Sequence, residues 1–390
     1  MSAGTIRRRA SSPIVVALVA LILGTAFVVA RLAHFDWDAS RFVNAGDRYV
    51  APALAPSELS VTRGSTGYDG QFYYRLSKNP FSTRFREYGV QFDSSPARHQ
   101  RILYPLLVWI LARSRITSTP ICMIVVNLAA LAGLGFVGAA LARSAERSPW
   151  LGLALPLYPA FVVALALDLA DIVAALLLAS SVLLLTRRRY LWATITLSLA
   201  GFTRETTLLL PIGWLAMLVF GHWKRRDTDE SLPIWIVVLP ISLVAAWQLV
   251  LWRAYGRHPF FAAGRQFGAP LLALLRQVGI WLNGHSAEDL FQLIELILVL
   301  SLLVAALYHL RGSKRHLLAG PLIVAAILAA GLYAEIWRSQ TNFLRALAEP
   351  AILSMLVLFD RSRDARVLMA GSTVLALANV GVWLGVGRFS

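Results

Sequence analysis

A carboxylate among aromatic rings marks the first segment of this sequence that could perform chemistry. Asp69 precedes Gly70 in the stretch GYDGQFYY. If this segment lies at a membrane edge, partial burial raises the pKa of Asp69 from about 4 and makes it a better proton acceptor. Gly70 lacks a Cβ and allows close approach of backbone or ligand. The neighbouring rings suit a stacking wall for a sugar or an interfacial aromatic belt, and the plain alternative is an Asp-Gly turn; these rings belong to Tyr68, Phe72, Tyr73 and Tyr74.

Basic side chains follow this motif and recur later in the chain. Arg98, His99 and Arg101 stand ahead of a short apolar run. Arginine forms bidentate bonds to phosphate oxygens, so this group can grip a phosphate or anchor a helix at lipid headgroups. Arg204 and Glu205 form a neighbouring pair among threonines, which is costly near lipid unless the pair faces a polar cavity.

Further charged residues allow both structural and functional interpretations. Asp168 and Asp171 can ligate a divalent cation or solvate a turn. Asp36, with Asp38, is suited to a helix cap or a solvated position. Arg338 and Arg345 lie near one helix end, where Arg345 and Glu349 are spaced as a helix-surface pair or face a buried cavity; Glu335 accompanies them.

The composition indicates the elements that must position these residues. The chain has 390 residues, of which 57% are hydrophobic and only 15% charged. Apolar runs such as 13–30 and 317–332 approach the ~20 residues that span a bilayer. The formal charge of +16 is spread as stops between apolar runs, which favours membrane topology over nucleic-acid binding. No Walker loop, dinucleotide-binding glycine motif or metal-spaced His/Cys set occurs, which argues against an ATP-driven pump.

The pattern predicts an all-α polytopic membrane protein with 1–390 as a single integral membrane domain. The N-terminal apolar run is interpreted as a retained signal anchor rather than a cleaved signal peptide. With Arg7, Arg8 and Arg9 cytoplasmic, the basic stops fall on one side of a cell (inner or plasma) membrane. Eleven crossings are expected, near 13–33, 119–142, 149–167, 171–186, 190–203, 206–221, 233–252, 290–310, 317–334, 343–359 and 366–387.

Two extracytoplasmic loops follow from this topology, at 34–118 and 253–289. The run 102–112 is about half a span long, so it is expected as a half-inserted or interfacial helix of the first loop. Residues 190–221 must turn back near Thr203-Arg204-Glu205 to keep the later basic stops inside. The charged candidates Asp36, Asp69, Arg101, Asp171, Arg204, Glu205, Arg338 and Arg345 then all fall on the outer side.

Three stretches resemble the GT-C fold glycosyltransferases, and most closely bacterial mannosyltransferase-like members. They read GYDGQFYYRLSKNP, RHQRILYPLL and GFTRETTLLLP. The resemblance implies an inverting transfer of a sugar from a polyprenyl-phosphate donor to an acceptor hydroxyl on a glycan, lipid or protein. It implies Asp69 as general base, arginines and in some members a divalent ion at the leaving phosphate, and Arg204 with Glu205 lining the cavity. Many members carry the acid close to the first helix, so Asp36 is an alternative base, with Asp69 organising the loop.

A transporter or flippase of a lipid-linked sugar is the main competing interpretation. Such proteins usually have repeated halves and acids at mid-membrane. Here no repeat is visible and the acids collect toward one face. An acyltransferase or lipid phosphatase would need a histidine site with a partner, which the spacing does not supply, and a purely structural membrane protein also stays open.

Overall fold

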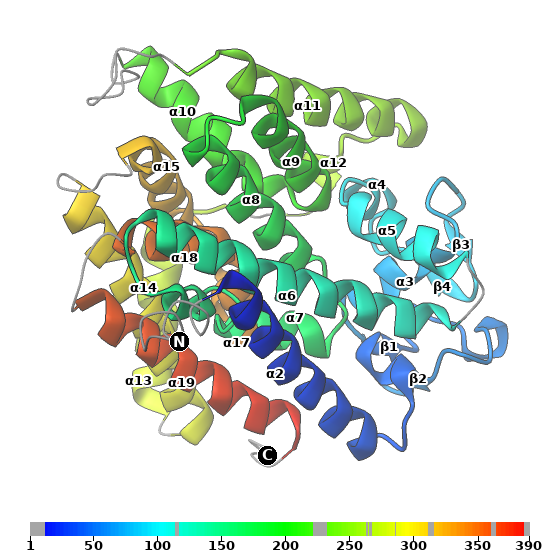
Figure 1. Cartoon of the computed structure of the whole chain (residues 1–390). Helices are drawn as coiled ribbons and strands as arrows, with labels where there is room; N and C mark the ends of the chain where they lie inside the picture. The colour runs from blue at the N-terminus through cyan, green and yellow to red at the C-terminus, as the bar shows by residue number, and fades with distance from the viewer. Residues whose placement is uncertain are drawn as a thin grey trace, which may run out of the picture.

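The computed structural model describes residues 12–113, 117–220, 232–262, 264, 267–284, 286–310, 316–359 and 364–385. Helices dominate this part of the chain, which confirms the predicted all-α class (Figure 1). Most basic stops used to orient the chain, at 7–9, 224–226, 311–315 and 361–363, lie outside the described residues.

Within the described residues, four helices are long and apolar enough to cross a membrane. They are α2 (Pro13–His34), α6 (Thr119–Ser144), α11 (Trp235–Tyr255) and α14 (Ala287–His309). A fifth span is possible if α17 (Gln340–Ala346) and α18 (Ala348–Leu358), bent by 53° at their junction, count as one. Long apolar helices of this kind are compatible with a multi-pass membrane protein.

The expected eleven full crossings are not found among the described residues. Several predicted spans are helices of 16 residues or fewer, which rise at most about 24 Å and fall short of the ~30 Å hydrocarbon core. The predicted span 149–167 is divided between two short helices. The short helices in the regions of the predicted spans are η3 (Pro149–Ala154), α7 (Pro159–Ala166), α8 (Asp171–Thr186), α9 (Tyr190–Thr203), η4 (Glu205–Leu208), α10 (Leu209–Val219), η6 (His316–Leu318) and α15 (Ala319–Ala330). The remaining helices of the bundle are α16 (Ala334–Trp337) and α19 (Asp364–Trp383).

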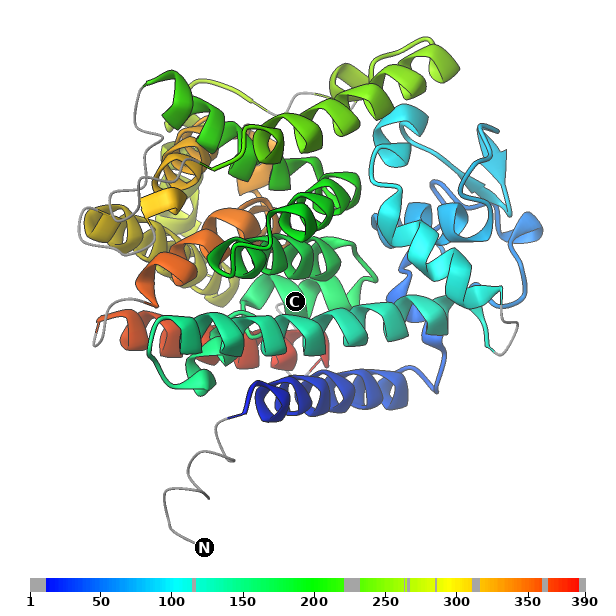
Figure 2. The same cartoon turned by 45° about the horizontal axis from the view of Figure 1, so that its top comes forward.

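The first loop is folded and lies beside one end of each of α2, α6 and α11 (Figures 1 and 2). Two small strand pairs stabilise it, one parallel between β1 and β2 and one antiparallel between β3 and β4. Its elements are η1 (Ala39–Phe42), β1 (Ala45–Gly46), η2 (Pro52–Leu54), β2 (Val61–Thr62), α3 (Gly70–Lys78), β3 (Arg86–Glu87), β4 (Val90–Gln91), α4 (Ser95–His99) and α5 (Leu103–Ala112).

Three local predictions can be compared with this fold. The short helix expected at 102–112 is present as α5 and contacts α3 and α6. The break expected near Thr203 is present, because α9 ends there and Arg204 is extended. The predicted second loop, 253–289, contains the helices α12 (Pro259–Ala262) and α13 (Leu272–Gly284) and the ends of its two flanking helices.

Candidate functional site

Asp69 stands at the start of α3, where the first loop meets the bundle. The helix begins at Gly70, whose Cα faces the backbone of two other segments. A Cβ at this position would come within 2.7 Å of the Val43 carbonyl oxygen and closer still to that of Leu167. Glycine therefore allows α3 to approach the bundle, and this approach sets the position of Asp69.

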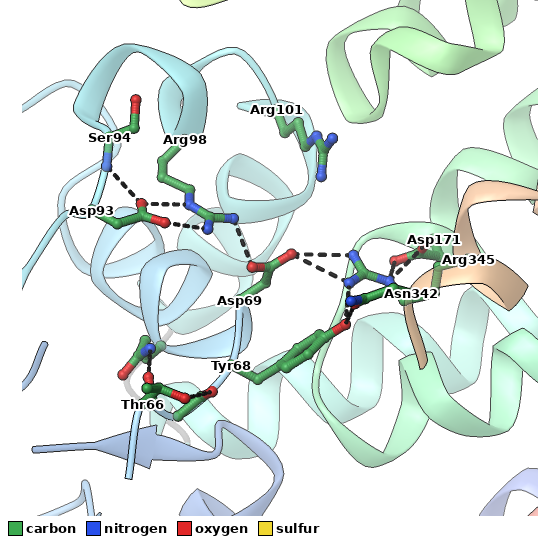
Figure 3. A network of polar contacts seen from close by, with 12 residues as sticks. Thr66, Tyr68, Asp69, Asp93, Ser94, Arg98, Arg101, Asp171, Asn342 and Arg345 are labelled. Carbon is green, nitrogen blue, oxygen red and sulfur yellow. Dashed lines mark hydrogen bonds and ion pairs between the residues drawn. The ribbon is translucent and has the colours of Figure 1, made fainter. Parts of the chain in front are cut away.

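Two arginines, one from the first loop and one from α17, hold the Asp69 carboxylate (Figure 3). Arg98 Nη1 donates to Asp69 Oδ1 at 2.7 Å, and Arg345 Nη1 and Nη2 each lie 3.3 Å from Oδ2. Asp93 holds the other edge of the Arg98 guanidinium at 2.6 Å. The carboxylate thus joins the first loop to α17.

The arginine partners of Asp69 shift its pKa in the direction opposite to the one expected from burial. Burial works to raise its pKa, but the guanidinium groups of Arg98, Arg345 and Arg101 outweigh burial and hold the pKa well below its ordinary value. The prediction of a raised pKa is therefore wrong for the protein without substrate. Neighbouring charge decides the direction here.

The ion network continues into the bundle through Asp171, the first residue of α8. Arg345 Nε lies 3.2 Å from Asp171 Oδ1, and Arg204 Nη1 donates to the same oxygen. Arg204 Nε also lies 3.4 Å from Glu349 Oε1. The Asp171 side chain is 1% exposed and that of Arg345 9%, so this half of the network is buried.

A second connection lies at the more exposed rim. Arg101 binds Glu205 in a bidentate pair, with Nε to Oε2 at 2.9 Å and Nη2 to Oε1 at 2.6 Å. Their side chains are 21% and 30% exposed. Arg101, like Asp69, belongs to the first loop, while Glu205 begins η4, so the pair crosses the same boundary.

The three tyrosines predicted to form an aromatic sugar wall lie in two different environments. Tyr68 belongs to the network, because its hydroxyl donates to Asn342 at 2.8 Å and accepts from Arg345 at 2.9 Å. Tyr73 and Tyr74 are instead fully buried within the first loop. The whole stretch 70–77 is buried, so these rings form core rather than an open stacking surface.

Four other predicted site residues lie apart from the Asp69 network. Asp36 is exposed in the turn after α2, and no described contact joins it to the network. Arg338 is largely exposed and pairs with Glu335. His99 is buried and bound by the Ser95 and Ser82 carbonyl oxygens, so it does not present a free edge to a phosphate. Asp168 is buried and its carboxylate oxygens have no hydrogen-bond partner among the described residues.

The described residues contain no group of three or more His, Cys, Asp or Glu arranged to hold a metal ion. Asp168 and Asp171 do not form such a group, and Asp171 is already shared by two arginines. One network member, Asn342, was missed in the sequence. It lies 274 residues from its partner Tyr68, and an isolated Asn in α17 gives no signal of such a contact.

The arrangement gathers four guanidinium groups around carboxylates at one end of the bundle. Its exposed edge is formed by Asp69, Arg98, Arg101 and Glu205, with side chains between 19% and 30% exposed. Such groups can bind a phosphate and can accept a proton from a hydroxyl. The chain matches no known family, no curated protein and no solved structure.

Proposed function

We propose that this protein is a polytopic membrane glycosyltransferase of the GT-C kind. It moves a sugar from a polyprenyl-phosphate donor to an acceptor hydroxyl at the extracytoplasmic face of the cell membrane, with its N-terminus in the cytoplasm. The observation that carries the proposal is the contact of Asp69 with Arg98 and Arg345. An acid and two guanidinium groups, a type of group suited to phosphate, meet where the first loop joins the apolar helices.

The direction of two helices supports this orientation. α8 begins at Asp171 in the network and ends at Thr186, about 24 Å away along its axis, just before Arg187, Arg188 and Arg189. α6 likewise begins beside the first loop, where the Thr119 N–H donates to Glu58, and ends next to Arg143. Basic stops at the far ends favour the cytoplasm for those ends and the outer side for the network.

The paired state of Asp69 suggests how the donor prepares the base. The donor phosphate binds Arg98 and Arg345 in place of the Asp69 carboxylate, as bidentate arginine–phosphate bonding allows. Loss of these partners raises the pKa of Asp69 and frees its oxygens. The acceptor oxygen then bonds to the anomeric carbon while the bond from that carbon to the phosphate oxygen breaks. The hydroxyl proton passes to Asp69, and polyprenyl phosphate leaves.

Substitution of Asp69 tests this function directly. Asp69→Asn removes the proton acceptor with little change in shape, so transfer should fall by about 10²–10⁴-fold. The assay follows radiolabelled sugar from polyprenyl-phosphate mannose, and from glucose and pentose analogues, in membranes that supply native acceptors. Wild-type turnover by Asp69→Asn removes this residue as the base.

Two parallel variants sharpen the result. Asp93→Asn is the matched control, because this acid contacts Arg98 without contacting Arg345, and it should retain most activity. Asp36→Asn separates the two candidate bases, and a selective loss in that variant transfers the role to Asp36. Movement of labelled donor across the bilayer without sugar transfer, by the wild-type protein, supports the flippase alternative instead.

A further inference from the structure

An arginine-lined pocket lies where α2 and α19 end, and Asp69 is not among its lining residues. Its volume is about 170 Å³. Leu167 lines this pocket, and its carbonyl oxygen packs against Gly70. The arginines and acids of the Asp69 network do not line the pocket. The side chains that matter for its chemistry are Arg31, Phe35, Ser40, Arg41, Asn44 and Trp383.

Arg31 provides a buried positive charge to this pocket. It is only 5% exposed, and no carboxylate lies within ion-pair distance of it in the described part of the chain. Nη1 donates to the Trp383 carbonyl oxygen at 2.7 Å, while Nε is enclosed and has no hydrogen-bond partner among the residues that the structure describes. A buried cation without an ion-pair partner has lost its hydration without compensation, so a charge held in this way favours the binding of an anionic group.

Aromatic rings stabilise this guanidinium without neutralising it. Its Cζ lies 4.9 Å from the ring centre of Phe35, 5.2 Å from that of Phe42 and 5.3 Å from that of Trp383. Cation–π contacts lower the energy of the cation and leave its net charge unchanged. The positive charge thus stays available to a ligand.

The nearby acids leave room for an anion. Asp168 acts on Arg31 electrostatically from beyond ion-pair distance. Asp38 lies 3.5 Å from Arg41, accepts from the Ser40 hydroxyl and does not line the pocket. The Arg41 side chain is 42% exposed, so it can turn toward a ligand at little cost.

We propose that this pocket binds the phosphate group of an anionic membrane lipid. Two guanidinium groups, from Arg31 and Arg41, and the Asn44 amide supply donors for phosphate oxygens. The site lies at the end of α2, a helix able to span a membrane, and Trp37 beside it is 65% exposed. Exposed tryptophan at a helix end is typical of the headgroup region, where lipid phosphates are found. The site is distinct from the transfer reaction and does not depend on it.

Lipid binding to the full-length protein tests this site. Native mass spectrometry compares phosphatidylglycerol with diacylglycerol, which lacks the phosphate. Arg31→Gln and Arg41→Gln should each weaken phosphatidylglycerol binding roughly tenfold and leave diacylglycerol binding unchanged. Arg48→Gln is the matched control, because Arg48 is exposed on the same loop and does not line the pocket.

Competition by soluble phosphates shows whether the pocket is specific for the phosphate of a lipid. Displacement of the lipid by millimolar inorganic phosphate or glycerol phosphate supports the site and adds a soluble ligand, whereas resistance to displacement supports the site as specific for lipid. If Arg31→Gln fails to fold, Arg41→Gln decides. Equal phosphatidylglycerol affinity in Arg41→Gln and Arg48→Gln overturns the proposal, as does equal affinity of the wild type for the two lipids.

Discussion

The Arg101–Glu205 pair allows stability and donor binding to be measured separately. We consider three variants, Arg101→Gln, Glu205→Gln and the double substitution, each of which keeps side-chain size and removes charge. The pair is bidentate and crosses the boundary between the first loop and η4. Each single variant leaves one charge without its partner, whereas the double variant removes both charges.

The expected magnitude follows from the partial burial of the two side chains. Exposed pairs contribute about 0–1 kcal/mol, and breaking a buried pair costs about 3–5 kcal/mol. With side chains 21% and 30% exposed, the pair lies between these limits. Each single variant should therefore lose about 2 kcal/mol of unfolding free energy. The double variant should lose no more than a single one, which gives a coupling energy of about 2 kcal/mol.

Denaturant unfolding in mixed micelles measures the stability of all three variants, and sugar transfer measures their activity. If Arg101 also holds the donor phosphate, Arg101→Gln and the double variant should bind the donor more weakly than Glu205→Gln, although all three lose similar stability. If the pair is purely structural, the three variants should lose activity to the same extent. Additive losses in the double variant, about 4 kcal/mol in total, would refute the inference that these two charges are coupled.

Two further predictions concern the positioning of the first loop. Gly70→Ala should lower the unfolding free energy by about 1–3 kcal/mol, because the new Cβ would meet the carbonyl oxygens of Leu167 and Val43. Gly279→Ala in α13 is the control: its Cβ would meet open space, so this variant should raise the unfolding free energy by about 0.5–1 kcal/mol. Equal effects of the two variants in unfolding assays would contradict the close approach of α3. Burial lowers the pKa of His99 and outweighs its hydrogen bonds to backbone carbonyl oxygens. As the pH falls, the unfolded chain therefore takes up a proton before the folded one, and the unfolding free energy should fall below about pH 6.5. His99→Gln should flatten this pH dependence of the unfolding midpoint, and an unchanged slope would exclude His99 as its source.

The sequence allowed the helical class and the local breaks to be predicted, but it could not supply the number of crossings. The runs 149–167 and 171–186 have the same hydropathy whether their side chains contact lipid or neighbouring helices. Much of α8 is buried by other elements, and the first of these runs is divided between η3 and α7. Hydropathy measures transfer from water and does not distinguish these two destinations.

The membership of the candidate site was predictable only in part, and its pairing was not predictable. Asp69, Arg101, Arg204 and Arg345 were recognised because ionisable residues among apolar runs require partners. The partner of Asp69 on α17, Arg345, lies 276 residues away, so neither this contact nor its effect on the pKa of Asp69 could be read from local spacing. The aromatic residues after Asp69 were misjudged because nearly every side chain of α3 is buried, and the sequence does not show which segments cover this helix.

Charge balance in the network constrains the order of events in the proposed reaction. Each oxygen of Asp69 faces a guanidinium group, and this pairing keeps the carboxylate ionised and makes it a weak base. An acceptor that arrived first would meet an acid with little tendency to take a proton. A donor phosphate that arrives first competes for Arg98 and Arg345, and the released carboxylate becomes more basic beside the bound anion. The proposed chemistry therefore requires donor binding before proton transfer, and it links the identity of the base to the arginines that hold the leaving group.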